Sequence, residues 1–143
     1  MRWALSLLSC VALGGVASCS ADPQASGITG VYDATQALQA GNTAIVRYWF
    51  TSDGKWGRVK RQIIGSTADD TCASTADATY ELKGDKVYLR DGARTEERTW
   101  ALLENNTLLK LDPGDTFING TLATTFKRAS TAQTTRTCNT AFQ

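Results

Sequence analysis

Short stretches in which apolar and polar residues alternate dominate the chain from residue 27 onward. A period of two is typical of strands that bury one face, because successive side chains point to opposite sides of a strand. The pattern therefore predicts about eight strands. They are Gly27–Asp33, Thr43–Thr51, Trp56–Ile64, Ala78–Lys83, Lys86–Asp91, Arg98–Leu103, Thr107–Asp112 and Phe117–Arg128.

Turn-forming residues separate these strands, notably at Ser52–Gly54 and at Asp112–Asp115. Gly and Asn accept a positive φ and Pro presets its own φ, so such clusters favour tight turns, and we interpret their aspartates as turn residues. Two segments depart from the alternation. Ala34–Ala40 has a helical composition and predicts a short helix that Gly41 ends. Ser66–Asp77 predicts an irregular connection.

Alternation also assigns side chains to faces. On the second strand Val46, Tyr48 and Phe50 share one side, whereas Arg47 and Trp49 take the other. Hairpin-linked strands with one apolar face leave exposed edges unless the sheet closes, which favours an all-β fold, a small antiparallel up-and-down β-barrel of about eight strands. We expect side chains to fill it, because eight strands enclose little room. The inward-facing set is Val46, Tyr48, Phe50, Tyr80, Leu82 and Trp100.

The N-terminal segment is typical of a secretory signal. Its apolar run over residues 3–16 is shorter than the roughly 20 residues that a membrane-spanning helix needs. The sequence Val-Ala-Ser-Cys at 16–19 resembles the lipobox of bacterial lipoproteins, in which the cysteine sulfur receives a diacylglyceryl group and the signal is cut off before it. The resemblance implies a signal peptide over 1–18 and lipidation of Cys19.

Residues 19–26 then form a flexible tether, and residues 27–143 form the folded domain. Each buried methylene contributes about 0.8 kcal/mol, so acylated Cys19 would hold the protein to a lipid bilayer. The resemblance places it on the periplasmic face of the outer membrane, because Ser20 and Ala21 lack the aspartate that retains enterobacterial-type lipoproteins at the inner membrane. The alternative is cleavage after Ala21, which would release a soluble periplasmic domain.

Two cysteines, Cys72 and Cys138, remain after either route of processing. In an oxidising compartment they most simply form one disulfide, which would tie the C-terminal tail to the body of the domain. A redox role is disfavoured because neither cysteine belongs to a Cys-x-x-Cys pair.

Two short motifs resemble those of lipocalins and their calycin relatives. Gly30-Val31-Tyr32 resembles the Gly-x-Trp of the first strand, and Phe126-Lys127-Arg128 resembles the closing strand. Between them, YELKGDKVYLRD and NTLLKLD resemble the small lipocalin-like domains of bacterial lipoproteins. The resemblance implies that the first and last strands pair, and that Arg128 packs over Tyr32 in a cation–π contact worth about 0.5–2 kcal/mol.

The amino-acid composition excludes several kinds of catalytic and binding site. The chain has 15 Lys plus Arg, 14 Asp plus Glu and no His. Near-neutral charge argues against nucleic-acid binding, and the lack of His excludes Ser-His-Asp catalysis and His-ligated zinc. The adjacent pairs Asp69-Asp70 and Glu96-Glu97 point to opposite sides of an extended chain, so neither forms a catalytic dyad. Asp69, Asp70 and Asp77 stand in one expected loop and could hold a calcium ion, but they lack EF-hand spacing. We predict no enzymatic activity, cofactor or metal site.

Positive charge is concentrated on the second and third strands, where Trp49 and Trp56 are expected to come close across the Ser52–Gly54 turn. Two aromatic rings beside several cations suit an anionic partner such as a lipid head group, lipopolysaccharide or an acidic glycan. The alternative is a solvated strand face with snorkelling side chains. The candidate ligand-binding residues are Arg47, Trp49, Trp56, Arg58, Lys60 and Arg61.

These observations favour a non-enzymatic, membrane-anchored periplasmic binding or accessory module. Its ligand would be a small apolar molecule at the barrel mouth, or a small anionic ligand or protein partner at the hairpin that carries Trp49 and Trp56. The alternative is a periplasmic inhibitor of a secreted protease or other enzyme, because small calycin-type barrels include protease inhibitors that use the segment before the first strand.

Overall fold

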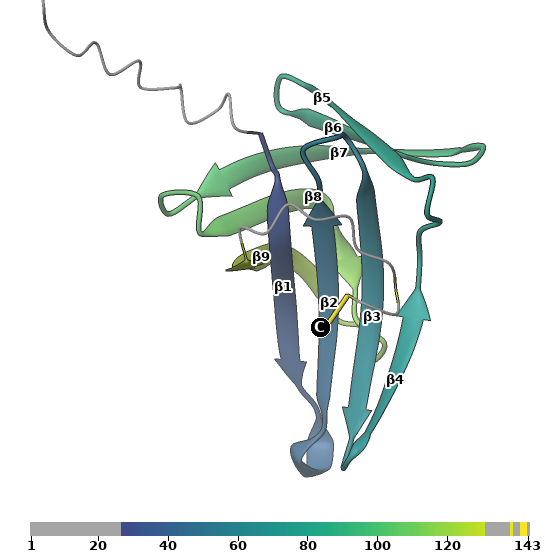
Figure 1. Ribbon diagram of the computed structural model, residues 1–143. Helices are drawn as coiled ribbons and strands as arrows, with labels where there is room; N and C mark the ends of the chain where they lie inside the picture. Colours follow the sequence, from purple (N-terminus) through teal and green to yellow (C-terminus); the bar gives the residue numbers. More distant parts are fainter. Residues whose placement is uncertain (1–26, 131–137, 139–140, 143) are drawn as a thin grey trace, which may run out of the picture.

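One curled antiparallel sheet makes up the protein in a computed structural model that describes residues 27–130, 138 and 141–142. The expected signal peptide, Cys19 and the tether lie outside these residues. Figure 1 shows β1 to β4 in front of the other strands. The elements are β1 (Gly30–Ala37), the 3-10 turn η2 (Gln39–Gly41), β2 (Thr43–Phe50), β3 (Trp56–Ile64), β4 (Thr67–Cys72), β5 (Thr79–Lys83), β6 (Lys86–Asp91), β7 (Arg94–Leu103), β8 (Leu108–Thr116) and β9 (Leu122–Ser130).

The strand order is β4-β3-β2-β1-β9-β8-β7-β6-β5. The first and last strands pair antiparallel, as expected. The two edges, β4 and β5, follow each other in the chain, and an isolated bridge between Lys55 and Thr79 joins the β2–β3 turn to the start of β5. The sheet thus curls into a half-barrel, in which β7, β8 and β9 run across behind β1, β2 and β3 (Figure 1).

The prediction of an all-β, antiparallel, barrel-like fold is confirmed, but β4 was not foreseen. The segment expected to be an irregular connection instead pairs with β3, from Ile64 opposite Thr67 to Val59 opposite Cys72. Every residue of β4 is exposed. The strand has no buried face and therefore no alternation of apolar and polar residues. Its backbone pairing with β3 cannot be predicted from the hydropathy pattern.

The predicted helix over Ala34–Ala40 is also wrong. Ala34 to Ala37 continue β1, and each pairs with a residue of β2. Only Gln39–Gly41 form a short 3-10 turn. Helix propensity is a weak preference, and here the burial of Ala34 in the core and the cross-strand hydrogen bonds outweigh it.

The expected turn at Asp112–Asp115 lies inside β8, which runs to Thr116. Pairing with β9 is interrupted between Lys110 and Asp115 and resumes with Asp115 opposite Ala123. Gly114 passes so close to β9 that a Cβ there would lie 2.0 Å from the Ala123 carbonyl oxygen. The Pro-Gly pair thus marks a strand irregularity instead of a turn, and it carries Asp115 into the interior.

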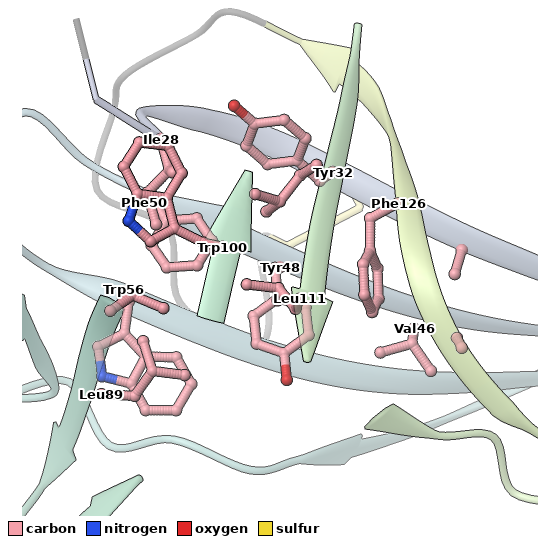
Figure 2. Close-up of a cluster of buried hydrophobic side chains, with 14 of the residues drawn as sticks. Ile28, Tyr32, Val46, Tyr48, Phe50, Trp56, Leu89, Trp100, Leu111 and Phe126 are labelled. Atoms are coloured by element: carbon pink, nitrogen blue, oxygen red, sulfur yellow. The ribbon is translucent and has the colours of Figure 1, made fainter. Parts of the chain in front are cut away.

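The concave side of the sheet holds the main core, which includes four of the six residues predicted to face inward, and the other two, Tyr80 and Leu82, are partly buried and pack against it. Tyr48 lies near its centre, with its ring stacked 6.0 Å from Phe50 and edge-on 5.2 Å from Phe126. Figure 2 shows Tyr48 among Leu111, Phe126 and Val46. Side chains therefore fill this part of the half-barrel, as expected from its size.

None of the helical segments within residues 27–130, 138 and 141–142 has the length and apolar character needed to cross a bilayer.

Candidate functional site

The candidate ligand-binding side chains of β2 and β3, including the two tryptophans, lie on two opposite faces of the sheet. Trp49 stands opposite Gly57, and Phe50 stands opposite Trp56. Trp56 belongs to the main core, whereas Trp49 belongs to a second buried cluster on the convex side. The expectation that the two tryptophans come together on one surface is therefore wrong, because they are separated by an odd number of positions along the hairpin.

On the convex side the described tail residues Cys138, Ala141 and Phe142 pack against the sheet. Val31, Trp49 and Val59 form the second cluster together with Ala141, and Phe142 packs against it. The Trp49 ring covers Gly57, where a Cβ would lie 1.9 Å from a ring carbon. This close approach requires glycine, although the backbone of Gly57 is ordinary strand.

The convex arginines are each matched by a carboxylate. Arg47 pairs with Asp33 through two hydrogen bonds, and Arg61 pairs with Asp70 at 2.6 Å. The Arg47 and Arg61 guanidinium carbons lie 4.3 and 3.7 Å from the Phe142 ring centre, and Arg47 also donates to the Ala141 carbonyl. We call Asp33, Arg47, Arg61, Asp70 and Phe142 the outer tail site; its two cations and two carboxylates balance.

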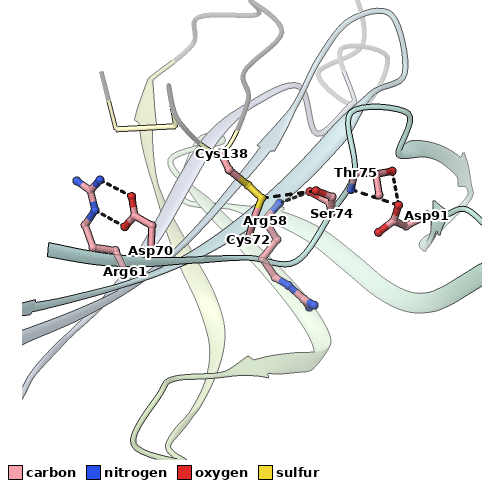
Figure 3. Close-up of a disulfide and its surroundings, with 8 residues drawn as sticks. All are labelled: Arg58, Arg61, Asp70, Cys72, Ser74, Thr75, Asp91 and Cys138. Carbon is pink, nitrogen blue, oxygen red and sulfur yellow. Dashed lines mark hydrogen bonds and ion pairs between the residues drawn. A yellow bond between two sulfur atoms is a disulfide. The ribbon is translucent and has the colours of Figure 1, made fainter.

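The predicted disulfide joins Cys72 at the end of β4 to Cys138 in the tail, with their Cα atoms 5.8 Å apart. Figure 3 shows it beside Arg61 and Asp70, with the Arg58 side chain pointing away. The covalent link keeps the tail close to the convex face and supports the stacking of Phe142.

Tyr32 and Arg128, the expected closing pair, are in contact. Arg128 Nη2 donates to Tyr32 Oη at 2.6 Å, and the guanidinium carbon lies 5.0 Å from the ring centre. Arg128 Nε also donates to the Asn106 carbonyl at 2.8 Å. Burial raises the pKa of Tyr32 to about 12, although the charge of Arg128 opposes the increase. The pair fastens β9 to β1 at the point where their pairing shifts register.

Inside the curl, Arg58 and Lys60 converge on Asp115 from the opposite part of the sheet. Arg58 Nη1 lies 2.8 Å from Asp115 Oδ2, and Lys60 Nζ lies 2.9 Å from Oδ1. Tyr48 Oη donates to Asp115 at 2.8 Å and accepts from Arg58 at 3.2 Å. Asp115 has a side chain that is only 6% exposed.

Two residues of β7 extend this network. Arg98 Nη2 lies 2.6 Å from Glu96 Oε2, and the same oxygen lies 3.9 Å from Arg58 Nη1. Arg98 Nη1 donates to the carbonyls of Pro113 and Gly114 at 3.3 Å. We call the five charged residues Arg58, Lys60, Glu96, Arg98 and Asp115 the interior charge cluster.

The interior charge cluster carries three cations and two carboxylates, a surplus of one positive charge. Arg58 and Arg98 side chains are 13% and 7% exposed. The Nε atoms of both are buried and have no hydrogen-bond partner among the described residues. Buried donors are normally satisfied, so two unused guanidinium donors in a positive interior are an unusual arrangement.

Electrostatics inside the cluster favour an ionised Asp115. Burial opposes the negative charge, but the hydrogen bond from Lys60 and the charge of Arg58 outweigh it and hold the pKa of Asp115 below its usual value. Burial raises the pKa of Tyr48, because Arg98 and Arg58 offset only part of the desolvation. Tyr48 therefore stays a neutral donor and Asp115 a fixed anion.

A small hollow of about 10 Å³ opens on the same side of the curl, in the gap between the end of β4 and strands β6 and β7. This volume is close to what one water molecule needs. Asp91 at its rim accepts hydrogen bonds from Thr75. The lining residues are Trp56, Ala73, Leu89, Asp91, Arg94 and Glu96.

Sequence reasoning singled out Arg58, Lys60 and Trp56, all of which face this interior. It missed Glu96, Arg98 and Asp115. Alternation offered a signal for two of them, because Glu96 and Arg98 share the inward face of Trp100. The position of Asp115 follows from the irregular pairing of β8, which no local pattern announced.

Comparison of the chain with family models, with curated proteins and with solved structures gives no match.

Proposed function

We propose that the chain is a non-enzymatic, lipid-anchored binding module of the bacterial cell envelope that holds a small anionic ligand inside its curled sheet. The proposal is carried by one observation, the interior surplus of positive charge with two unused guanidinium donors. The lipobox-like Val-Ala-Ser-Cys at residues 16–19 supports the anchor.

The physical reason is the cost of a buried charge. A cation taken out of water is destabilising unless an anion and hydrogen bonds compensate it. Lys60 and Arg58 share Asp115, and Arg98 relies on Glu96, which is partly open to solvent. An anion in contact with Arg58 and Arg98 would compensate their charge, and charge-assisted hydrogen bonds are among the strongest that proteins make.

The outer tail site, by contrast, does not support anion binding. Its arginines already have their own carboxylates, and Phe142 covers both guanidinium groups. Of the six candidate residues, we therefore assign Arg58, Lys60 and Trp56 to the proposed site, and we assign Arg47, Trp49 and Arg61 to the attachment of the tail.

Calorimetric titration of the purified full chain with sodium acetate and with sodium phosphate tests the proposal. We expect saturable binding with a Kd of about 1 mM. An anion as small as acetate, with four non-hydrogen atoms, can supply the binding free energy that this Kd requires. Arg98→Gln should abolish it, whereas Arg61→Gln, the matched control on the convex face, should retain it. Absence of saturable heat, or equal binding by both variants, would overturn the interior site.

The anchor is tested separately by mass spectrometry of the protein from the membrane fraction. We expect an acylated peptide that begins at Cys19, and we expect Cys19→Ala to move the protein out of that fraction. An unmodified product that begins after Ala21 would contradict the anchor. Slowing of a panel of secreted proteases by a chain that binds no anion would instead favour an inhibitor.

A further inference from the structure

Glu96 occupies the position between the two interior guanidinium groups that an anionic ligand would take. Its Oε2 lies 2.6 Å from Arg98 Nη2 and 3.9 Å from Arg58 Nη1. We infer that Glu96 is an internal stand-in for the carboxylate of the ligand, and that the ligand is a small carboxylate that displaces it. The inference rests on the proposed function, because it names the ligand class and the competitor at the same site.

Exposure identifies Glu96 as the movable member of the interior charge cluster. Its side chain is 32% exposed, against 6% for Asp115 and 7% for Arg98. Its carboxylate is already partly hydrated and can turn further toward water, which compensates for part of the lost contact with Arg98, whereas Asp115 is fixed by Tyr48, Arg58 and Lys60. Glu96 also lines the hollow, so its departure would enlarge that space.

Size and charge both indicate that a ligand carboxylate replaces Glu96 and does not bind beside it. The hollow of about 10 Å³ beside Glu96 has room for one water molecule and is not lined by Arg58 or Arg98, so it offers no second place for a carboxylate at these two guanidinium groups. Two carboxylates at one pair of guanidinium groups would also repel each other. A ligand carboxylate that replaces Glu96 removes both conflicts.

Shape favours a carboxylate over other anions. The interior already accepts a planar carboxylate between Arg98 and Arg58, and the guanidinium fork matches that geometry. The lining residues Trp56 and Leu89 offer apolar contact to the body of the ligand. We therefore expect short-chain carboxylates to bind in preference to phosphate.

Glu96→Gln tests the inference, with Glu97→Gln as the matched control. Glutamine keeps an oxygen that can accept from Arg98 but loses the charge that competes with the ligand. Glu97 is the next residue, faces the opposite side and pairs with Lys86. Titration of the full chain with sodium acetate should show a Kd about tenfold lower in Glu96→Gln than in the wild type, because a competing internal state no longer reduces the apparent affinity. Glu97→Gln should match the wild type.

Each other outcome is decisive. Equal acetate affinity in the wild type and Glu96→Gln overturns the stand-in while the proposed function survives. Weaker binding in Glu96→Gln makes Glu96 a ligand contact, which also overturns it. Absence of binding in both overturns the proposed function itself, and a preference for phosphate contradicts the ligand class. Glu96→Ala, checked by circular dichroism, provides the same comparison where the glutamine variant does not fold.

Discussion

The outer tail site and the interior charge cluster are built from the same two strands, yet they treat charge differently. On the convex face Arg47 and Arg61 each have a carboxylate of their own and share an aromatic ring. In the interior, three cations share two carboxylates. The balanced cluster attaches the described tail residues to the sheet, whereas the surplus in the interior supports the proposal of an anion from outside the chain.

Alternation along β3 produces this division. Arg58 and Lys60 point inward, Arg61 points outward, and Gly57 makes room for Trp49 on the convex face. Positive charge that is continuous in the sequence is thus divided between the outer tail site and the interior charge cluster. Counting basic residues on a hairpin is less informative than pairing each one with its own carboxylate.

The largest expected difference between the two regions comes from removing one carboxylate in each. Asp115→Ala removes a buried carboxylate that Arg58 and Lys60 share, which should lower the free energy of unfolding by about 3–5 kcal/mol. Asp33→Ala removes the partner of a half-buried Arg47 and should cost about 1–2 kcal/mol. Urea denaturation of both variants checks the order. Equal losses would mean that the interior cluster is no more tightly coupled than the outer one.

Removing the disulfide should lower the stability of the domain without changing the interior charge cluster. Cys72→Ser with Cys138→Ser should lower the free energy of unfolding by about 2–4 kcal/mol, because the unfolded chain regains the freedom of a long loop. Acetate affinity should be unchanged, since the tail lies on the other side of the sheet. A parallel loss of affinity would show that the two regions are coupled.

A steric change at the convex face should have a smaller effect. Gly57→Ala places a methyl group against the Trp49 ring and should cost about 1–3 kcal/mol. In a Trp49→Ala background the same change should cost much less, and a double-mutant cycle measures the difference. An unchanged cost would place the strain in the backbone instead of the ring.

Acidification should give the smallest effect and should act through the interior. The pKa of Asp115 is lowered in the folded protein, so the unfolded chain binds more protons and stability rises with pH in this range. The contribution is present above an ordinary aspartate pKa of about 4 and is lost as pH falls through the folded value. Asp115→Asn should flatten this acid limb of urea-denaturation curves. If Asp115→Asn loses stability at acid pH as steeply as the wild type, other carboxylates cause the pH dependence.

Sequence patterns predicted the strands that bury one face, including β3 and β6 with their observed bounds. They failed at β4, which is exposed throughout and has no apolar face, and at Ala34–Ala37, where burial of Ala34 and pairing with β2 outweigh a helical composition. The interior site was half visible, since Arg58 and Lys60 were singled out. Asp115 was hidden because its place depends on the register shift between β8 and β9, which the alternation of apolar and polar residues does not reveal.

The central claim is that the interior guanidinium groups bind an external carboxylate while the outer ones do not. The most direct measurement is a ¹H–¹⁵N spectrum of the arginine Nε–H groups during titration with acetate, assigned by single Arg→Lys variants. We expect the Arg58 and Arg98 signals to shift and saturate while those of Arg47 and Arg61 stay in place. Signals from Arg58 and Arg98 that do not respond, or that move no more than those of Arg47 and Arg61, would contradict the account.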